Sequence, residues 1–199
     1  NENITLDTST VVASDLNTLD NNTTGIINVD SVTTIQGLAS DINAAYASDG
    51  ISKTDPLNVG TESVILTDST VKVSDLNALD NNTTGPIDAA FVTTITGSAF
   101  DINNAYLSSG ITGLGNENIT LDTSTVDASD LNTLNSKTTG TINADSVETI
   151  EGLASDINTA YASDGISKTN LGTETVILHD STVDASALNT LSSASSASS

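Results

Sequence analysis

The phrase TVVASDLNTLDNNTTG at residues 10–25 decides the fold, because the chain repeats it. Close copies stand at 70–85 (TVKVSDLNALDNNTTG) and 125–140 (TVDASDLNTLNSKTTG), and a shortened copy, TVDASALNTL, begins at residue 182. Such self-similarity is typical of repeat architectures, in which one unit cannot bury its apolar face alone and must stack on its neighbours. The phrase therefore indicates a molecule whose function depends on shape and length.

The repeat has a long and a short period. Residues 1–54 match residues 116–169, and each long unit divides again, since ASDLN at 13–17 resembles ASDIN at 39–43. We expect a single solenoid over residues 1–191 followed by a low-complexity Ser/Ala tail at 192–199. Its seven short units lie at approximately 1–24, 25–60, 61–84, 85–115, 116–139, 140–172 and 173–191. Because the chain begins inside a repeat, we expect it to be part of a longer array.

Aligned units share apolar columns that predict short strands with one buried face. One column stands near the start of each unit: Ile4, Ile27, Val64, Ile87, Ile119, Ile142 and Val176. Another follows later: Val11, Ile35, Val71, Ile95, Val126, Ile150 and Val183. We expect successive units to pair these strands in parallel, about 4.8 Å apart, with variable loops absorbing the differences in unit length.

A helical segment is predicted after the second strand of each unit. A Ser-Asp pair precedes it, and the serine is a candidate N-cap that accepts backbone N–H groups. These candidate caps are Ser14, Ser40, Ser74, Ser129 and Ser155. An α-helix is about 10 Å wide, twice the strand spacing, so we expect segments of one or two turns in the odd units to alternate with longer helices in the even units. We predict a mainly β fold, a parallel β-solenoid of about seven coils with short helical corners; the alternative is a curved, horseshoe-like α/β solenoid.

The charge balance excludes some partners. The chain of 199 residues has 26 Asp and Glu, four Lys and no Arg, which gives a formal net charge of −22. A phosphate backbone would be repelled, so we expect no nucleic-acid partner. No apolar run is long enough for direct insertion into a membrane. Cysteine is absent, which excludes disulfides and thiolate metal sites.

One aspartate recurs in six units and is the candidate metal ligand. The set is Asp15, Asp41, Asp75, Asp101, Asp130 and Asp156, with Ala187 in the last unit. Stacked carboxylates would attract Ca²⁺, a hard cation that binds six to eight oxygens. The alternative needs no ion, since an aspartate is also favourable at the positive end of a helix. No other cofactor is expected.

A threonine column is the candidate ice-binding surface. It consists of Thr10, Thr34, Thr70, Thr94, Thr125, Thr149 and Thr182. No second threonine rank stands beside it, and β-branched threonine also suits ordinary strands. For catalysis, no acidic residue is set apart from its repeat copies. His179 replaces Thr67 of the matching unit, and nothing fixes it beside a nucleophile. We therefore expect no enzymatic activity.

The phrases ASDLNTL, DINxAY and GITGLGNE carry a resemblance that covers almost all of residues 1–191. They resemble the tandem repeats of very large, acidic surface or secreted proteins of marine cyanobacteria and their phages. The resemblance implies an extracellular, repetitive, non-enzymatic building block and carries over no catalytic residues.

The sequence favours a structural function. We expect a spacer or filament segment of an extracellular fibre or surface protein, at the cell surface or on a virion fibre. Its expected partners are copies of itself, bound through the ends of the solenoid, or neighbouring repeats. The alternative is an adhesin or phage-fibre module that binds glycans or ice.

Overall fold

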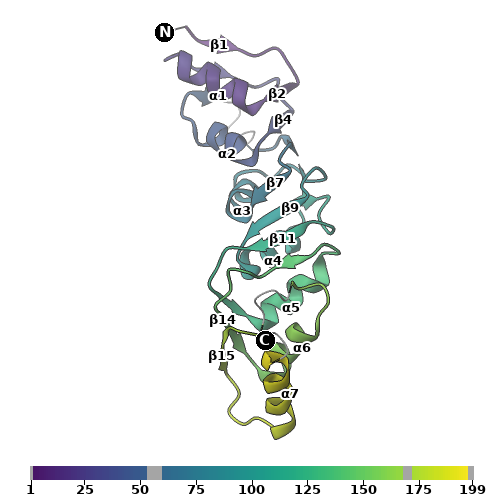
Figure 1. Ribbon diagram of the computed structural model, residues 1–199. Helices are drawn as coiled ribbons and strands as arrows, with labels where there is room; N and C mark the ends of the chain where they lie inside the picture. The colour runs from purple at the N-terminus through teal and green to yellow at the C-terminus, as the bar shows by residue number, and fades with distance from the viewer. Residues whose placement is uncertain (1, 53–59, 168–171, 197–199) are drawn as a thin grey trace. The chain divides into compact units, whose positions relative to one another are not determined.

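The computed structural model describes residues 2–52, 60–167 and 172–196 (Figure 1). Of the described residues, 37% are helical and 25% lie in strands, in seven α-helices and fifteen strands. The chain divides into two compact units. Unit 1 comprises Asn1–Val92 and Ser108–Leu114, and unit 2 comprises Thr93–Leu107 and Gly115–Ser199.

Unit 1 contains three helices and nine strands. The helices are α1 (Ala13–Asn22), α2 (Ala39–Ala47) and α3 (Val73–Asn82). The strands are β1 (Ile4–Thr5), β2 (Thr10–Val12), β3 (Ile27–Asn28), β4 (Thr34–Gly37), β5 (Ile51–Ser52), β6 (Ser63–Leu66), β7 (Thr70–Lys72), β8 (Ile87–Asp88) and β10 (Ile111–Thr112).

Unit 2 contains four helices and six strands. The helices are α4 (Ala99–Leu107), α5 (Ala128–Lys137), α6 (Ala154–Ala162) and α7 (Ala185–Ser196). The strands are β9 (Thr94–Gly97), β11 (Asn118–Leu121), β12 (Thr125–Asp127), β13 (Ile142–Asn143), β14 (Thr149–Gly152) and β15 (Thr175–Leu178).

The described strands pair in parallel, but equivalent strands do not always meet. In unit 1, one sheet has the order β1-β3-β5 and a second has the order β10-β8-β6-β4-β2. The second sheet joins two sequence columns, because Ile35 of β4 pairs with Val64 of β6. We call this pairing of residues from different columns the step in register. It recurs in unit 2, where Ile95 of β9 pairs with Ile119 of β11. A later column of one repeat therefore continues into an earlier column of the next.

An additional strand explains the uneven spacing of the repeats. It lies in the longer of the short units, such as 25–60 and 85–115, where we expected only a variable loop. Ile51 of β5 pairs with Ile27, Ile111 of β10 pairs with Ile87, and Ile166 forms a single bridge with Ile142. The adjoining segments 53–59 and 168–171 lie outside the described residues.

The prediction of a mainly β solenoid with short helical corners is wrong. The described residues form an α/β fold with seven helices and four parallel sheets, and no closed solenoid. The odd-numbered helices α1, α3 and α5 are ten residues long, where only one or two turns were expected. Each begins two residues before the Ser-Asp aspartate and continues through the polar residues that follow the last leucine. The last helix, α7, extends into the Ser/Ala tail.

The predicted serine caps are also wrong. Ser14, Ser40, Ser74, Ser129 and Ser155 are each the second residue of a helix and are exposed. The cap positions of α1, α2 and α6 are Val12, Leu38 and Leu153, which make no side-chain cap bond. Because the serines lie inside the helices, their hydroxyls cannot bond the free N–H groups of the first turn in the way an N-cap does.

The apolar columns form the core, as predicted. Ile27, Val64, Ile87 and Ile142 are completely buried, and Ile119 is 1% exposed. The helices contribute a second row of buried side chains, with Leu16, Ile42 and Leu76 in unit 1. The core of each unit therefore consists mainly of aliphatic side chains from its strands and its helices.

Candidate functional site

The six candidate aspartates each lie in the first turn of a different helix, α1 to α6. Asp15 and Asp101 are exposed, and the other four are half-buried. The described residues contain no group of three or more His, Cys, Asp or Glu side chains that could hold a metal ion. The structure therefore places one of these carboxylates at the start of each of the six helices, a position that the ion-free alternative also requires.

The backbone of these aspartates, however, joins successive repeats. In α1, α2, α4, α5 and α6, the asparagine two residues after the aspartate donates its side-chain amide to a carbonyl in the next helix. Asn17 Nδ2 lies 2.8 Å from Asp41 O, and Asn43 Nδ2 lies 2.8 Å from Asp75 O in unit 1. In unit 2 the same bond joins Asn103 to Asp130, Asn132 to Asp156 and Asn158 to Ala187. We call this set the asparagine ladder.

A buried glutamate forms a second contact between repeats, and sequence reasoning missed it. Glu62 and Glu117 are 5% and 0% exposed, which is rare for a carboxylate unless it is paired. Glu117 accepts a bond from Tyr106 Oη at 2.8 Å and from the Gly115 N–H at 2.9 Å. Glu62 has equivalent partners in Tyr46 and Gly60.

The third copy of this contact is looser. Glu174 accepts from Tyr161 Oη at 3.5 Å and from the Gly172 N–H. In all three copies the glutamate follows the glycine by two residues, and each glycine has a positive φ. The recurring Gly-x-Glu phrase and the tyrosine of the preceding unit are the sequence signal that could have located it. We call these three copies the Tyr–Glu junctions.

Burial next to these carboxylates affects the tyrosines. Burial raises the pKa of Tyr106 well above its ordinary value, and the hydrogen bond to Glu117 and the negative charge of that residue raise it further. Burial, together with Glu62 and Glu174 respectively, raises the pKa of Tyr46 and Tyr161 in the same direction. The junctions therefore favour neutral tyrosines that donate hydrogen bonds.

A Thr-Thr-Gly phrase packs against the backbone of the same glutamates. Thr138 Oγ1 donates to Glu117 O at 2.6 Å and accepts from the Gly140 N–H at 2.9 Å. A Cβ added at Gly140 would lie 2.2 Å from Glu117 O, so only glycine fits this approach. In unit 1 Thr83 Oγ1 likewise accepts from the Gly85 N–H, but it donates mainly to Gly60 O at 2.7 Å and lies 3.5 Å from Glu62 O.

Two helices receive their N-terminal cap from the following repeat. The Ala39 N–H at the start of α2 donates to Asp68 Oδ2 at 2.9 Å, and the Ala154 N–H at the start of α6 donates to Asp180 Oδ2 at 2.8 Å. Burial raises the pKa of Asp68, although the hydrogen bonds from backbone N–H groups, with Ala39 first, oppose the shift.

The start of α5 has a different, local cap. Asp127 accepts from the N–H groups of Ser129 and Asp130. Burial raises the pKa of Asp127, but the bonds from the Ser129 hydroxyl and these backbone groups outweigh it, so the pKa lies below its ordinary value. Burial and the charge of Asp127 raise the pKa of Asp130.

The threonine column does not form an unbroken rank in the described sheets. In unit 1 Thr10 pairs with Thr34, which pairs with Ser63. In unit 2 Thr94 pairs with Asn118, whereas Thr125, Thr149 and Thr175 are paired in sequence. The step in register therefore interrupts the ladder that the sequence alignment indicated.

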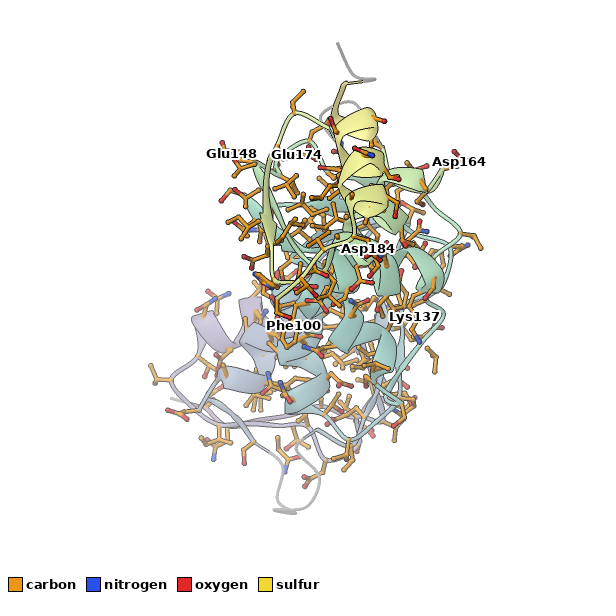
Figure 2. The ribbon with its side chains drawn as sticks, turned by 90° about the horizontal axis from the view of Figure 1, so that it is seen from below. Phe100, Lys137, Glu148, Asp164, Glu174 and Asp184 are labelled. Atoms are coloured by element: carbon orange, nitrogen blue, oxygen red, sulfur yellow. The ribbon has the colours of Figure 1, made fainter. Side chains whose placement is uncertain are left out.

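The described surface of unit 2 carries dispersed acidic groups. Figure 2 shows Glu148 and Glu174 on one side of unit 2 and Asp164 on the other.

A cavity of about 30 Å³ in unit 1 is lined mainly by core side chains, with Tyr46 and Glu62 at its polar part. It has room for about one or two water molecules. His179 Nε2 lies 3.7 Å from Glu151 Oε2.

Among the described residues, no helix combines the length and the apolar character that crossing a membrane requires. Comparisons with models of protein families, with curated proteins and with solved structures found no match.

Proposed function

We propose that the chain is a structural repeat segment, a spacer or filament building block of an extracellular fibre or surface protein. The observation that carries this proposal is the recurrence of the same contacts between consecutive repeats within each unit. The asparagine ladder and the Tyr–Glu junctions are formed by phrases that recur along the chain, and they attach one repeat to the next. Because its recurring polar residues bond each repeat to the next, the chain is suited to building an extended array of repeats.

These contacts give the proposal a mechanism. Each repeat buries its apolar columns against its neighbours, and its polar side chains satisfy backbone groups of the next repeat. Stability is then approximately a sum of repeat terms and nearest-neighbour terms. Adding repeats extends the structure without changing the chemistry of any junction, and no unique constellation of reactive groups is required.

The test is to examine the purified 199-residue chain by negative-stain electron microscopy and sedimentation velocity over a hundredfold range of concentration. We expect elongated particles that associate end to end as the concentration rises. A monodisperse, rounded monomer at every concentration would contradict both the spacer and the filament.

The second candidate is a binding module of an adhesin or a phage fibre. One observation favours it: both phenylalanines of the chain are exposed, Phe91 by 67% and Phe100 by 60%. A spacer does not need such side chains at its surface. Binding of the labelled chain to an array of immobilised glycans would support this candidate, and no binding above that of a Phe100→Ser variant would oppose it.

A further inference from the structure

One helix of unit 2 exposes apolar side chains that its sister helices lack. Phe100 and Leu107 of α4 are 60% and 69% exposed. They are seven residues apart, which places them on one face of the helix. Asn104 and Asp101 complete the exposed part of this helix. We call the exposed face formed by Phe100, Asn104 and Leu107 the α4 patch.

The repeats themselves show that folding does not require these side chains. The residues aligned with Phe100 and Leu107 are Ser40 and Ala47 in α2, and Ser155 and Ala162 in α6. All four are exposed, so the same backbone forms with small side chains at these positions. The exposed Phe91 likewise replaces Ser31 and Ser146 of the sister repeats. Large exposed apolar groups on an otherwise polar surface mark sites of interaction.

Two acidic residues belong to the elements that carry or adjoin the α4 patch. Asp101 lies on the same helix, and Asp130 of α5 is adjacent, since Asn103 Nδ2 donates to its carbonyl oxygen at 2.9 Å. Lys137 is in the last turn of α5, whereas Phe100 is in the first turn of α4, and Figure 2 shows the two residues well apart. A second copy of this chain would bring another formal net charge of −22.

We propose that the α4 patch is a docking surface for a basic amphipathic helix of a partner protein. Phe100 and Leu107 are spaced about 10 Å along the helix, which fits the apolar stripe of a partner helix with anchors at i, i+3 or i+4, and i+7. Lysine or arginine residues beside that stripe would face Asp101 and the first turn of α5. Charge complementarity thus selects a cationic partner over a second copy of the chain.

The test measures binding of three fluorescein-labelled 18-residue probe peptides to the complete chain by fluorescence anisotropy. The first is a Leu/Lys peptide with its leucines on one helical face. The second replaces those leucines with serine at the same charge, and the third replaces the lysines with glutamate. We expect the Leu/Lys peptide to bind at least tenfold more tightly than either of the others.

The variant and its control come from the repeats. The double variant F100S/L107A introduces the residues that α2 and α6 already contain, and we expect it to weaken binding of the Leu/Lys peptide at least tenfold. Leu153, 46% exposed at the start of α6, is aligned with Ser98, so Leu153→Ser is a matched removal of an exposed apolar group elsewhere in unit 2. We expect this control to bind the peptide as the parent chain does.

Three outcomes would overturn the proposal. Equal binding of the Leu/Lys peptide to the parent and to F100S/L107A would show that only the general negative charge attracts it. Equal binding of the Leu/Glu peptide would remove the argument from charge. Self-association of the parent that F100S/L107A abolishes would identify the α4 patch as an interface between copies. Far-UV circular dichroism of each variant verifies that it is folded.

Discussion

At the scale of single residues, the asparagine ladder is the most regular contact between repeats. Asn132 in α5 donates to Asp156 O in α6 at 2.8 Å. We expect Asn132→Ala to lower the free energy of unfolding by about 1–2 kcal/mol, because it removes a half-buried hydrogen bond and leaves its acceptor without that donor. The measurement is urea unfolding followed by circular dichroism.

The matched control for the ladder is Asn104→Ala in α4. Asn104 is exposed, and its aligned residue in α2 is Ala44. We expect this change to alter the free energy of unfolding by less than about 0.5 kcal/mol. If the two alanine variants lost equal stability, the ladder would not contribute to the attachment of one repeat to the next.

The Tyr–Glu junctions predict sensitivity to alkali. Burial and Glu117 raise the pKa of Tyr106 above the value of a free tyrosine, which is about 10. Above about pH 10 the unfolded chain therefore loses a phenolic proton that the folded chain keeps. Stability is fully present below that pH and declines above it, by at most about 1.4 kcal/mol per pH unit for each such tyrosine.

The test compares urea unfolding of the parent and of Tyr106→Phe between pH 7 and pH 12. We expect the variant to be less stable at pH 7, since Glu117 loses a donor, but to lose less stability than the parent above pH 10. Parallel stability curves throughout this range would show that Tyr106 ionises equally in both states.

Burial could be predicted residue by residue, but the polar contacts could not. The alternation around Ile27 or Ile142 is a local property of the strand, so it indicated the buried face without knowledge of the neighbours. The acceptor of Asn132 is instead a carbonyl 24 residues away, and only the register of the two repeats brings them together. Glu117 appeared as one acidic residue among many, because its burial depends on Tyr106 and Gly115.

At the scale of elements, the sequence pattern did not show how full helices fit beside strands that lie much closer together. Packed helices lie about 8–10 Å apart, whereas paired strands lie about 4.8 Å apart. In unit 1, α1 packs on α2 and α2 packs on α3, while the strands pair between the same repeats. The step in register places Ile35 beside Val64, so the strands that pair between these repeats are not equivalent ones.

The prediction of short corners failed because it treated the strand spacing as the only constraint. If every strand paired with its equivalent, full helices would crowd or force the stack to open. The step was not visible in the aligned columns, since Ile35 and Val64 belong to different columns of the alignment. The extra strands β5 and β10, of two residues each, were too short to recognise as strands.

The helix caps supplied by the following repeat give a prediction at this scale. Asp180 accepts from the first N–H of α6 and lies near the positive end of that helix. We expect Asp180→Ala to destabilise unit 2 by about 1 kcal/mol and to accelerate hydrogen exchange in the first turn of α6. Asp180→Asn should restore most of the loss, because an amide oxygen can also accept this bond.

The control for this cap is Asp164→Ala, which removes an exposed carboxylate two residues beyond the end of α6. We expect it to leave both the unfolding transition and hydrogen exchange in α6 unchanged. Equal acceleration of exchange in both variants would mean that the loss of negative charge, and not the cap, is responsible.

At the scale of the whole molecule, the repeats in the sequence predicted how consecutive units pair, but they did not predict the fold class. The alignment of the short units predicted parallel pairing between consecutive units, which the described strands confirm. It did not determine the proportion of helix, because the same residues fit a short corner and a ten-residue helix. The exposed Phe100 differs from Ser40 and Ser155, and such a departure from the repeat is informative only when exposure is known.

The net charge of −22 gives the prediction that belongs to this scale. The few lysines leave most carboxylates without an opposite charge, so self-repulsion destabilises the folded state at neutral pH. Between 10 mM and 1 M ionic strength the Debye length falls from about 30 Å to about 3 Å. We therefore expect the midpoint of thermal unfolding at pH 7 to rise by several degrees as NaCl is added over this range.

Two comparisons separate this repulsion from other effects of salt. Near pH 4.1, the pI of the sequence, the net charge vanishes, and the rise in the midpoint should become much smaller. An equal rise at both pH values would show that NaCl acts through apolar hydration.

CaCl₂ at matched ionic strength and pH 7 tests the aspartates at the helix starts, since specific binding would stabilise the folded state beyond screening. The removal of that excess by Asp130→Asn and Asp156→Asn would then identify these carboxylates as calcium ligands.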